Sequence, residues 1–273
     1  MSQIRIGGVD IEYYDDDFRD PWSREDGVPL LMLHGFAENA SVWIPWVPGL
    51  SKKYRVLRYS MRGCGKSSMP PDKSWSGEAI VKESLDLLNA LKVQQVHFIG
   101  SMSGAVFGQL FALTYPDRIK SLTLLDGPSK IPDELIKRYS LDQTDPATAI
   151  EKYGLVEWSK RTLHIRIDIT VGDPRIVEWY HKQKSGGPTE VGAAIMRTAQ
   201  VADLRPMLKN IKCPVLILTG DRNALTPAED LRVQEREIPN AKLIIFENLG
   251  SGCRFLMTDR CVEEVLKFYE SIG

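Results

Sequence analysis

Apolar runs of strand length recur along the chain, and amphipathic stretches of helical length separate several of them. Strands with little polar alternation are typical of a parallel sheet that is covered on both faces. Apolar positions at helical spacing in residues 78–91 and 261–272 predict helices that provide such cover. The predicted strands lie at residues 28–33, 54–59, 96–101, 121–126, 213–219 and 241–246. The pattern therefore predicts an α/β fold with a mostly parallel sheet.

Two regions depart from this pattern. Residues 3–6 and 9–14 alternate around Gly7-Gly8 and predict an antiparallel hairpin, which brings the expected sheet to eight strands. From about residue 128 to 205 the periodicity loosens into short, polar helical segments. We interpret residues 128–205 as a helical lid (cap) inserted into a core domain made of residues 1–127 and 206–273.

Composition narrows the functional classes. A chain of 273 residues with 43% apolar residues and a net charge of -1 carries no basic excess, so nucleic acid is not an expected partner. The start of the chain lacks the apolar core of a signal peptide, and no run approaches the ~20 apolar residues of a membrane span. We expect a cytoplasmic protein without a membrane partner. The four cysteines form no metal-binding or disulfide pattern, which predicts reduced thiols, no metal and no cofactor.

Residues 96–105 carry the most informative motif. An apolar strand meets a corner rich in glycine and serine and continues as a helix, which is the layout of a nucleophile elbow. Gly100 and Gly104 flank the corner because the chain passes too close to itself there for a Cβ atom. The side chain thrust out by the turn belongs to Met102, and methionine cannot act as a nucleophile.

Together with four further motifs, this elbow resembles that of the α/β-hydrolase fold superfamily, and the resemblance covers nearly the whole chain. It implies that the chain adopts the α/β-hydrolase fold, with the catalytic triad in the order nucleophile, acid, histidine. The further motifs are His34-Gly35-Phe36, the segment 62–67, Tyr115-Pro116-Asp117-Arg118-Ile119 and the segment 220–227.

All three triad positions that the resemblance implies are replaced in this sequence. Met102 stands at the nucleophile position, Asn223 follows Gly220 where the acid belongs, and Ser251 follows Gly250 where the histidine belongs. A serine needs an imidazole to take its proton and a carboxylate to orient that imidazole. We therefore expect no hydrolysis of generic esters, and we expect Met102, Asn223 and Ser251 to meet at the ends of their strands.

The resemblance further implies an oxyanion hole, because this feature uses backbone N–H groups, here of Phe36 and Ser103. Candidates for proton transfer are His164 and His181 in the predicted lid, although a lone histidine is more often a surface or packing residue. Five residues are candidate substrate contacts: His34, Gly35, Ser101, Trp158 and Trp179.

Several alternatives stay open at this stage. Ser103 becomes the nucleophile if the elbow is shifted by one residue, and Asp126 stands where some relatives carry the acid. Met102 could equally plug a pocket that is no longer used. The favoured hypothesis is a cofactor-independent, non-hydrolytic enzyme, of the cyclase, isomerase, lyase or decarboxylase type, that acts on a small apolar carbonyl compound. The alternatives are a ligand-binding or scaffolding pseudoenzyme and a serine hydrolase through Ser103. Pairing with a second copy of the chain, as a homodimer, also stays open.

Overall fold

A computed structural model describes residues 1–23, 27–184 and 187–273 of the chain. The predicted strands form one eight-stranded sheet in the order β1-β2-β4-β3-β5-β6-β7-β8. The first two strands are the antiparallel hairpin, β2 pairs antiparallel with β4, and all remaining neighbours are parallel. The strands are β1 (Ser2–Ile6), β2 (Val9–Asp16), β3 (Leu30–Leu33), β4 (Val56–Tyr59), β5 (Val96–Ser101), β6 (Ile119–Leu125), β7 (Val215–Gly220) and β8 (Ala241–Phe246).

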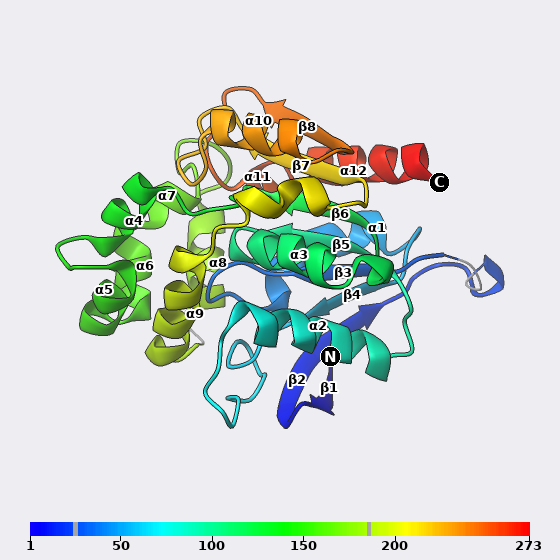
Figure 1. Ribbon diagram of the computed structural model, residues 1–273, viewed down its shortest axis with the longest axis horizontal. Helices are drawn as coiled ribbons and strands as arrows, with labels where there is room; N and C mark the ends of the chain where they lie inside the picture. The colour runs from blue at the N-terminus through cyan, green and yellow to red at the C-terminus, as the bar shows by residue number, and fades with distance from the viewer. Residues whose placement is uncertain (24–26, 185–186) are drawn as a thin grey trace.

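Helices cover both faces of the sheet, as the unbroken apolar strands require (Figure 1). Successive residues of β3 point to opposite faces, so Leu31 packs into one apolar core and Met32 into the other. On the first face lie α2 (Gly77–Ala90), α3 (Ser103–Thr114) and α10 (Ala228–Glu237), and on the second lie α1 (Val47–Leu50), α11 (Cys253–Leu256) and α12 (Thr258–Ile272). The predicted fold is confirmed.

Between β6 and β7 the described residues form six α-helices, which project beyond one end of the sheet (Figure 1). The two connections to the sheet meet where Lys130 and Asp203 form an isolated antiparallel bridge and the Leu204 N–H donates to the Ser129 carbonyl over 2.9 Å. The helices are α4 (Asp133–Ser140), α5 (Pro146–Tyr153), α6 (Leu155–Arg161), α7 (Leu163–Arg166), α8 (Arg175–Lys184) and α9 (Thr189–Val201). We call α4 to α9 the helical insertion.

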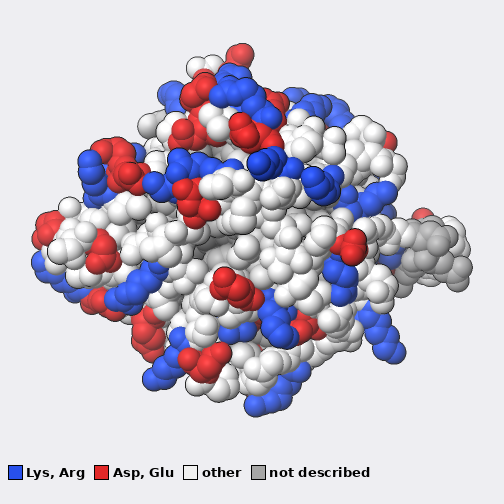
Figure 2. All heavy atoms as spheres, in the orientation of Figure 1, with Lys and Arg blue, Asp and Glu red and all other residues white. Residues whose placement is uncertain are grey.

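Short 3-10 helices complete the described structure: η1 (Pro21–Ser23), η2 (Ala40–Trp46), η3 (Pro116–Arg118) and η4 (Arg205–Asn210). No helix among the described residues is both long and apolar enough to span a bilayer. Figure 2 shows basic and acidic side chains interspersed over the face in view. No single-sign patch dominates that face, in keeping with the nearly balanced charge of the sequence.

Candidate functional site

The sharp turn between β5 and α3 places Met102 at the elbow. Met102 has φ 53° and ψ -119°, the strained backbone of a nucleophile position, and its N–H donates to the Leu125 carbonyl over 2.9 Å. A Cβ on Gly100 would lie 2.3 Å from the Gly104 carbonyl oxygen, which explains the glycine at that position. Ser103 is the first residue of α3, so the register that would make it the nucleophile is wrong.

Asn223 and Ser251 meet, as expected for the other two triad positions. The Ser251 hydroxyl donates to the Asn223 side-chain oxygen over 2.8 Å. The Asn223 amide donates to Asp126 over 2.9 Å and to the Thr219 hydroxyl over 2.7 Å. Asp126 is fully buried, and its second carboxylate oxygen accepts from the N–H groups of Gly252 and Cys253. Burial raises the pKa of Asp126, while these hydrogen bonds oppose the increase.

Met102 and Asp126 line the same cavity of about 50 Å³, which is large enough for a few water molecules. Asp126 also accepts the hydrogen bond from Asn223, so Met102 and the Asn223–Ser251 pair both adjoin this carboxylate. In the described part of the chain no hydrogen bond joins Met102 to Asn223 or Ser251, and the expected meeting of all three positions stays a prediction.

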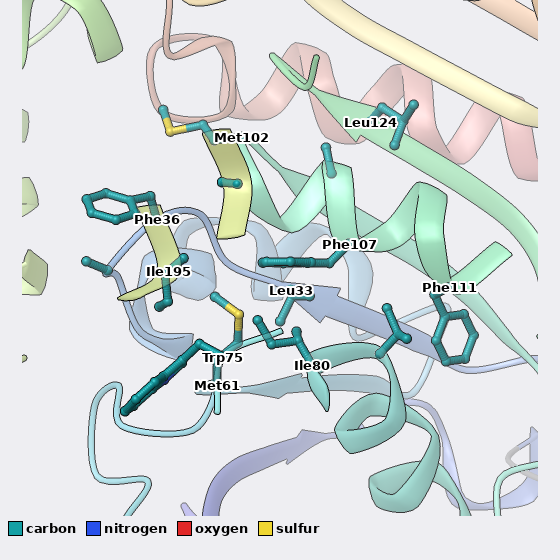
Figure 3. Packing of buried hydrophobic residues seen from close by; sticks show 14 of the residues in the cluster. Leu33, Phe36, Met61, Trp75, Ile80, Met102, Phe107, Phe111, Leu124 and Ile195 are labelled. Carbon is teal, nitrogen blue, oxygen red and sulfur yellow. The ribbon is translucent and has the colours of Figure 1, made fainter. Parts of the chain in front are cut away.

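This cavity is apolar with a few polar groups. Its lining comes from the elbow, from the loop after β3, from the loop after β6 and from the helical insertion. Figure 3 shows Met102 and Phe36 near the start of α3, with Leu33 and Phe107 lower in the view, towards the centre of the apolar core. The lining residues are Phe36, Met102, Ser103, Val106, Asp126, Pro128, Ile131, Leu135, Tyr139, Arg166, Met196, Ala199 and Leu225.

Three polar groups of Phe36 and Ser103 lack partners at this cavity. Within the described residues, the backbone N–H groups of Phe36 and Ser103 find no acceptor. The Ser103 hydroxyl is also buried without a hydrogen-bond partner. Unpaired buried donors cost free energy, so their presence beside a cavity indicates a place for a ligand oxygen.

A buried ion cluster lies behind Met102. The Arg254 guanidinium donates to Glu38 over 2.6 Å, to the Ser101 hydroxyl, and approaches the Met102 sulfur at 4.0 Å. The Lys184 ammonium lies 3.8 Å from Glu38 and donates to the Phe36 carbonyl. Through Lys184, helix α8 is therefore attached to the loop after β3, whose Phe36 N–H is one of the donors at the cavity.

Burial and pairing set the protonation states in this cluster. Burial raises the pKa of Glu38, but Arg254 and Lys184 outweigh it and lower that pKa to about 2. Burial lowers the pKa of Lys184 to about 7, because the attraction of Glu38 offsets the desolvation only in part and Arg166 and Arg254 repel a further positive charge.

The predicted contacts next to the elbow lie behind Met102 and outside the cavity lining. Burial lowers the pKa of His34 to about 4, and its ring accepts from the Met61 N–H while the other nitrogen faces the Gly35 carbonyl at 2.8 Å. His34 is thus a neutral residue that braces its loop. Gly35 donates its N–H to Glu38, and Ser101 is engaged by Arg254.

The predicted lid residues are also absent from the described cavity lining. Trp158 is fully buried and packs its ring edge to face against Phe36 at 5.5 Å, whereas Trp179 packs on Phe255 beside an outer groove. His164 is exposed and shares a separate cleft with Ser251. His181 is half-buried and absent from the cavity lining. These four residues form the packing and surface of the helical insertion.

Sequence reasoning missed the buried charges: Glu38, Arg166, Lys184 and Arg254. Charged side chains are usually exposed, and those that meet here are far apart in the sequence. One signal was available in the sequence: the charged residue Glu38 lies two residues after the His34-Gly35-Phe36 motif. Among the described residues no group of three or more histidine, cysteine or acidic side chains could hold a metal ion.

Comparisons with known proteins agree with this geometry. A family model described as the alpha/beta hydrolase fold matches residues 28–163. The enol-lactonase of Burkholderia xenovorans superimposes with a TM-score of 0.86 at 22% identity, covering 98% of this chain and 100% of that one. The chain belongs to the α/β-hydrolase fold superfamily. The elbow of this α/β-hydrolase fold protein is therefore the family's elbow, with methionine at its tip.

Curated relatives of this α/β-hydrolase fold protein are named as enzymes. A putative carbamate hydrolase of Caulobacter sp. is 26% identical over 253 residues, which are 89% of this chain and 91% of that protein. A 3-oxoadipate enol-lactonase of Acinetobacter baylyi is 25% identical over 228 residues, or 83% of each chain. The relatives are thus hydrolases by name.

Proposed function

We propose that the protein is a cofactor-independent enzyme that carries out non-hydrolytic chemistry on a small carbonyl compound, as a cyclase, isomerase, lyase or decarboxylase. The observation that carries this proposal is the pair of free N–H donors, of Phe36 and Ser103, at an apolar cavity whose elbow residue is Met102. Such donors stabilise an oxygen that gains negative charge. An enolate has this charge, and it is the intermediate that these reaction types share.

Asp126 is the proposed proton acceptor. It lines the cavity, and burial raises the pKa of its carboxyl group, which brings a carboxylate closer to the basicity that proton abstraction requires. The Oδ1 atom of Asp126 takes a proton from the carbon next to the carbonyl, as the Thr219 hydroxyl turns from Oδ1 to the Gly220 carbonyl. The electron pair of that C–H bond forms a C=C bond, and the π pair of the carbonyl moves to its oxygen. The enolate oxygen then faces the N–H groups of Phe36 and Ser103. Return of the proton to another carbon completes an isomerisation.

Hydrolysis is disfavoured because the described site lacks a histidine that could take the proton of a serine nucleophile. The cavity lining contains no histidine, and the ring of His34 is neutral and engaged by backbone groups. Without an imidazole, a hydroxyl stays a weak nucleophile. This supports a departure from the hydrolytic chemistry named for the relatives.

Hydrogen–deuterium exchange of the substrate tests the proposal. Methyl ketones such as 2-heptanone are incubated with the protein in D2O, and loss of the protons next to the carbonyl is followed by NMR. We expect exchange above the buffer rate that is lost in Asp126→Asn and kept in Asp72→Asn, a variant of an exposed carboxylate. Absence of both exchange and binding across a panel of enolisable ketones would refute the proposal.

Hydrolytic probes provide the contrast. We expect no turnover of p-nitrophenyl butyrate and no labelling by a fluorophosphonate. Labelling at Ser103, located by peptide mass spectrometry, would instead favour a serine hydrolase. A second candidate, a ligand-binding pseudoenzyme, is favoured by the small cavity, since about 50 Å³ leaves little room beside Met102. Ketone binding without exchange would identify that second function.

A further inference from the structure

Buried charges around the cavity do not balance within the protein. Arg254 and Lys184 share one carboxylate, Glu38. Asp126 is the buried carboxylate of the described cavity lining, and hydrogen-bond donors without charge hold both of its oxygens. Arg166 adds a third buried cation, so positive charges exceed negative ones by one when Lys184 is protonated.

Arg166 has no carboxylate partner among the described residues. Its guanidinium donates to the Thr162 hydroxyl over 2.7 Å, to the carbonyl and hydroxyl of Ser159 over 2.6 and 3.0 Å, and to the Tyr180 hydroxyl over 3.2 Å. All of these acceptors are neutral. Burying an ion without a counter-ion is costly. The guanidinium also has a hydrogen bond with the Tyr139 side chain, but no described carboxylate offsets its charge.

Arg166 also faces the same cavity as the two free backbone donors. Phe36, Ser103, Tyr139 and Arg166 all contribute to its lining. The ring of Trp158 lies 5.5 Å from the Phe36 ring and 5.0 Å from the guanidinium carbon, so Phe36 and Arg166 share one wall. One cavity therefore presents donors for a carbonyl oxygen and, elsewhere on its lining, an uncompensated cation.

Resting on the function proposed above, we propose that the carbonyl compound bound here is a monoanion, a short keto acid whose carboxylate pairs with Arg166 while its carbonyl oxygen meets the Phe36 and Ser103 N–H groups. One negative charge restores the balance of the buried cluster. The carboxylate accepts a guanidinium N–H in place of a neutral partner such as Tyr139, and charge-assisted hydrogen bonds of this kind are the stronger ones. The unbranched side chains of Met102 and Met196 line the cavity and can change rotamer to admit such a ligand.

Calorimetric titration with four six- or seven-carbon probes tests the inference. The probes are 5-oxohexanoate, 5-oxohexanamide, hexanoate and 2-heptanone. We expect 5-oxohexanoate to bind at least about tenfold more tightly than the amide, a ratio that corresponds to one charge-assisted hydrogen bond. Arg166→Gln is expected to abolish this preference and to keep 2-heptanone binding. The matched control Arg197→Gln changes an exposed arginine of α9 next to Met196 and is expected to leave the preference intact.

The outcomes separate this inference from the proposed function. Equal binding of acid and amide overturns the anion subsite while carbonyl binding, and with it the proposed function, stands. Equal binding of hexanoate and 5-oxohexanoate supports the anion subsite but overturns the role of the carbonyl. Failure of all four probes overturns both. A preference for the acid that persists in Arg166→Gln overturns the assignment of the anion subsite to Arg166. If that variant does not fold, the comparison of acid with amide in the unmodified protein still decides whether the site prefers an anion.

Discussion

At the scale of single residues, Asn223 and Asp126 are complementary. The Asn223 amide group donates to the Asp126 carboxylate, while its oxygen accepts from Ser251 and from the Leu225 N–H at 2.8 Å. A carboxylate at position 223 would place two negative oxygens about where the 2.9 Å hydrogen bond now lies. The asparagine at position 223 is therefore matched by the buried carboxylate that follows β6.

Asn223→Asp is expected to lower the free energy of unfolding by about 1–3 kcal/mol at pH 7.5, because one hydrogen bond becomes a repulsion between buried charges. The repulsion raises a carboxyl pKa in the folded state above its unfolded value, so the loss shrinks as the pH falls towards 5. Urea unfolding at the two pH values measures both effects. The double substitution Asp126→Asn with Asn223→Asp again pairs one amide donor with one carboxylate acceptor. This double variant should recover the free energy of unfolding that Asn223→Asp loses. A loss that does not change with pH would contradict this account.

Lys184 predicts a second pH dependence. Burial, together with repulsion by Arg166 and Arg254, lowers the pKa of its ammonium to about 7, and the attraction of Glu38 offsets this only in part. Between that value and its ordinary pKa near 10.5 the unfolded chain holds a proton that the folded chain has released. The free energy of unfolding therefore rises with pH in this window, by about 1.4 kcal/mol per unit from this group. Urea unfolding between pH 7 and 9 should show a smaller rise in Lys184→Met, whereas Lys137→Met, an exposed lysine, keeps the full rise. Equal slopes in all three proteins would rule out a depressed pKa.

At the scale of secondary-structure elements, the elbow depends on the close approach of α3 to β3. A Cβ on Gly104 would lie 2.5 Å from the carbonyl oxygens of both Leu33 and His34. These are backbone atoms, which cannot move aside as a flexible side chain can. Gly104→Ala is therefore expected to abolish folding or to cost more than about 4 kcal/mol. Gly108→Ala on the same helix meets only the side chains of Leu122 and Phe98 at 3.0 Å and should be milder. Expression yield and thermal unfolding compare the two, and similar behaviour would argue against the close approach.

The same elements explain what the sequence could predict. The strands and the elbow register followed from apolar runs and from two glycines, because backbone proximity leaves no other residue type at those positions. The bounds differ slightly, since the predicted strand 54–59 begins only at Val56 and the final helix begins at Thr258. The site was predicted where it uses backbone groups. Its charges were not, because Glu38, Lys184 and Arg254 meet only after the helical insertion and α11 have packed.

At the scale of the whole molecule, one buried carboxylate joins three separate parts of the fold. Glu38 follows β3 in the sheet core, Lys184 ends α8 of the helical insertion, and Arg254 belongs to α11. The helices of the insertion are short, from four to thirteen residues, so their stability comes from tertiary contacts rather than from propensity. Beside Glu38, the Asn39 amide donates to the Gln183 carbonyl over 3.0 Å. The charge cluster is thus a principal attachment of α8 to the core.

Glu38→Gln leaves two buried cations without their carboxylate, and breaking a buried pair in this way costs about 3–5 kcal/mol. We expect the loss to appear as faster amide hydrogen exchange in three separate peptides together: the loop at residues 34–40, α8, and α11. Exchange in the edge strand β8 should stay unchanged, because β8 pairs with β7 and packs mainly against α10. Glu134→Gln removes an exposed carboxylate of α4 and serves as the control without effect. Mass spectrometry of the exchanged peptides distinguishes this pattern from two others. Faster exchange confined to residues 34–40 would mean that Glu38 holds only its own loop, and a uniform increase would mean that the insertion and the core open as one unit.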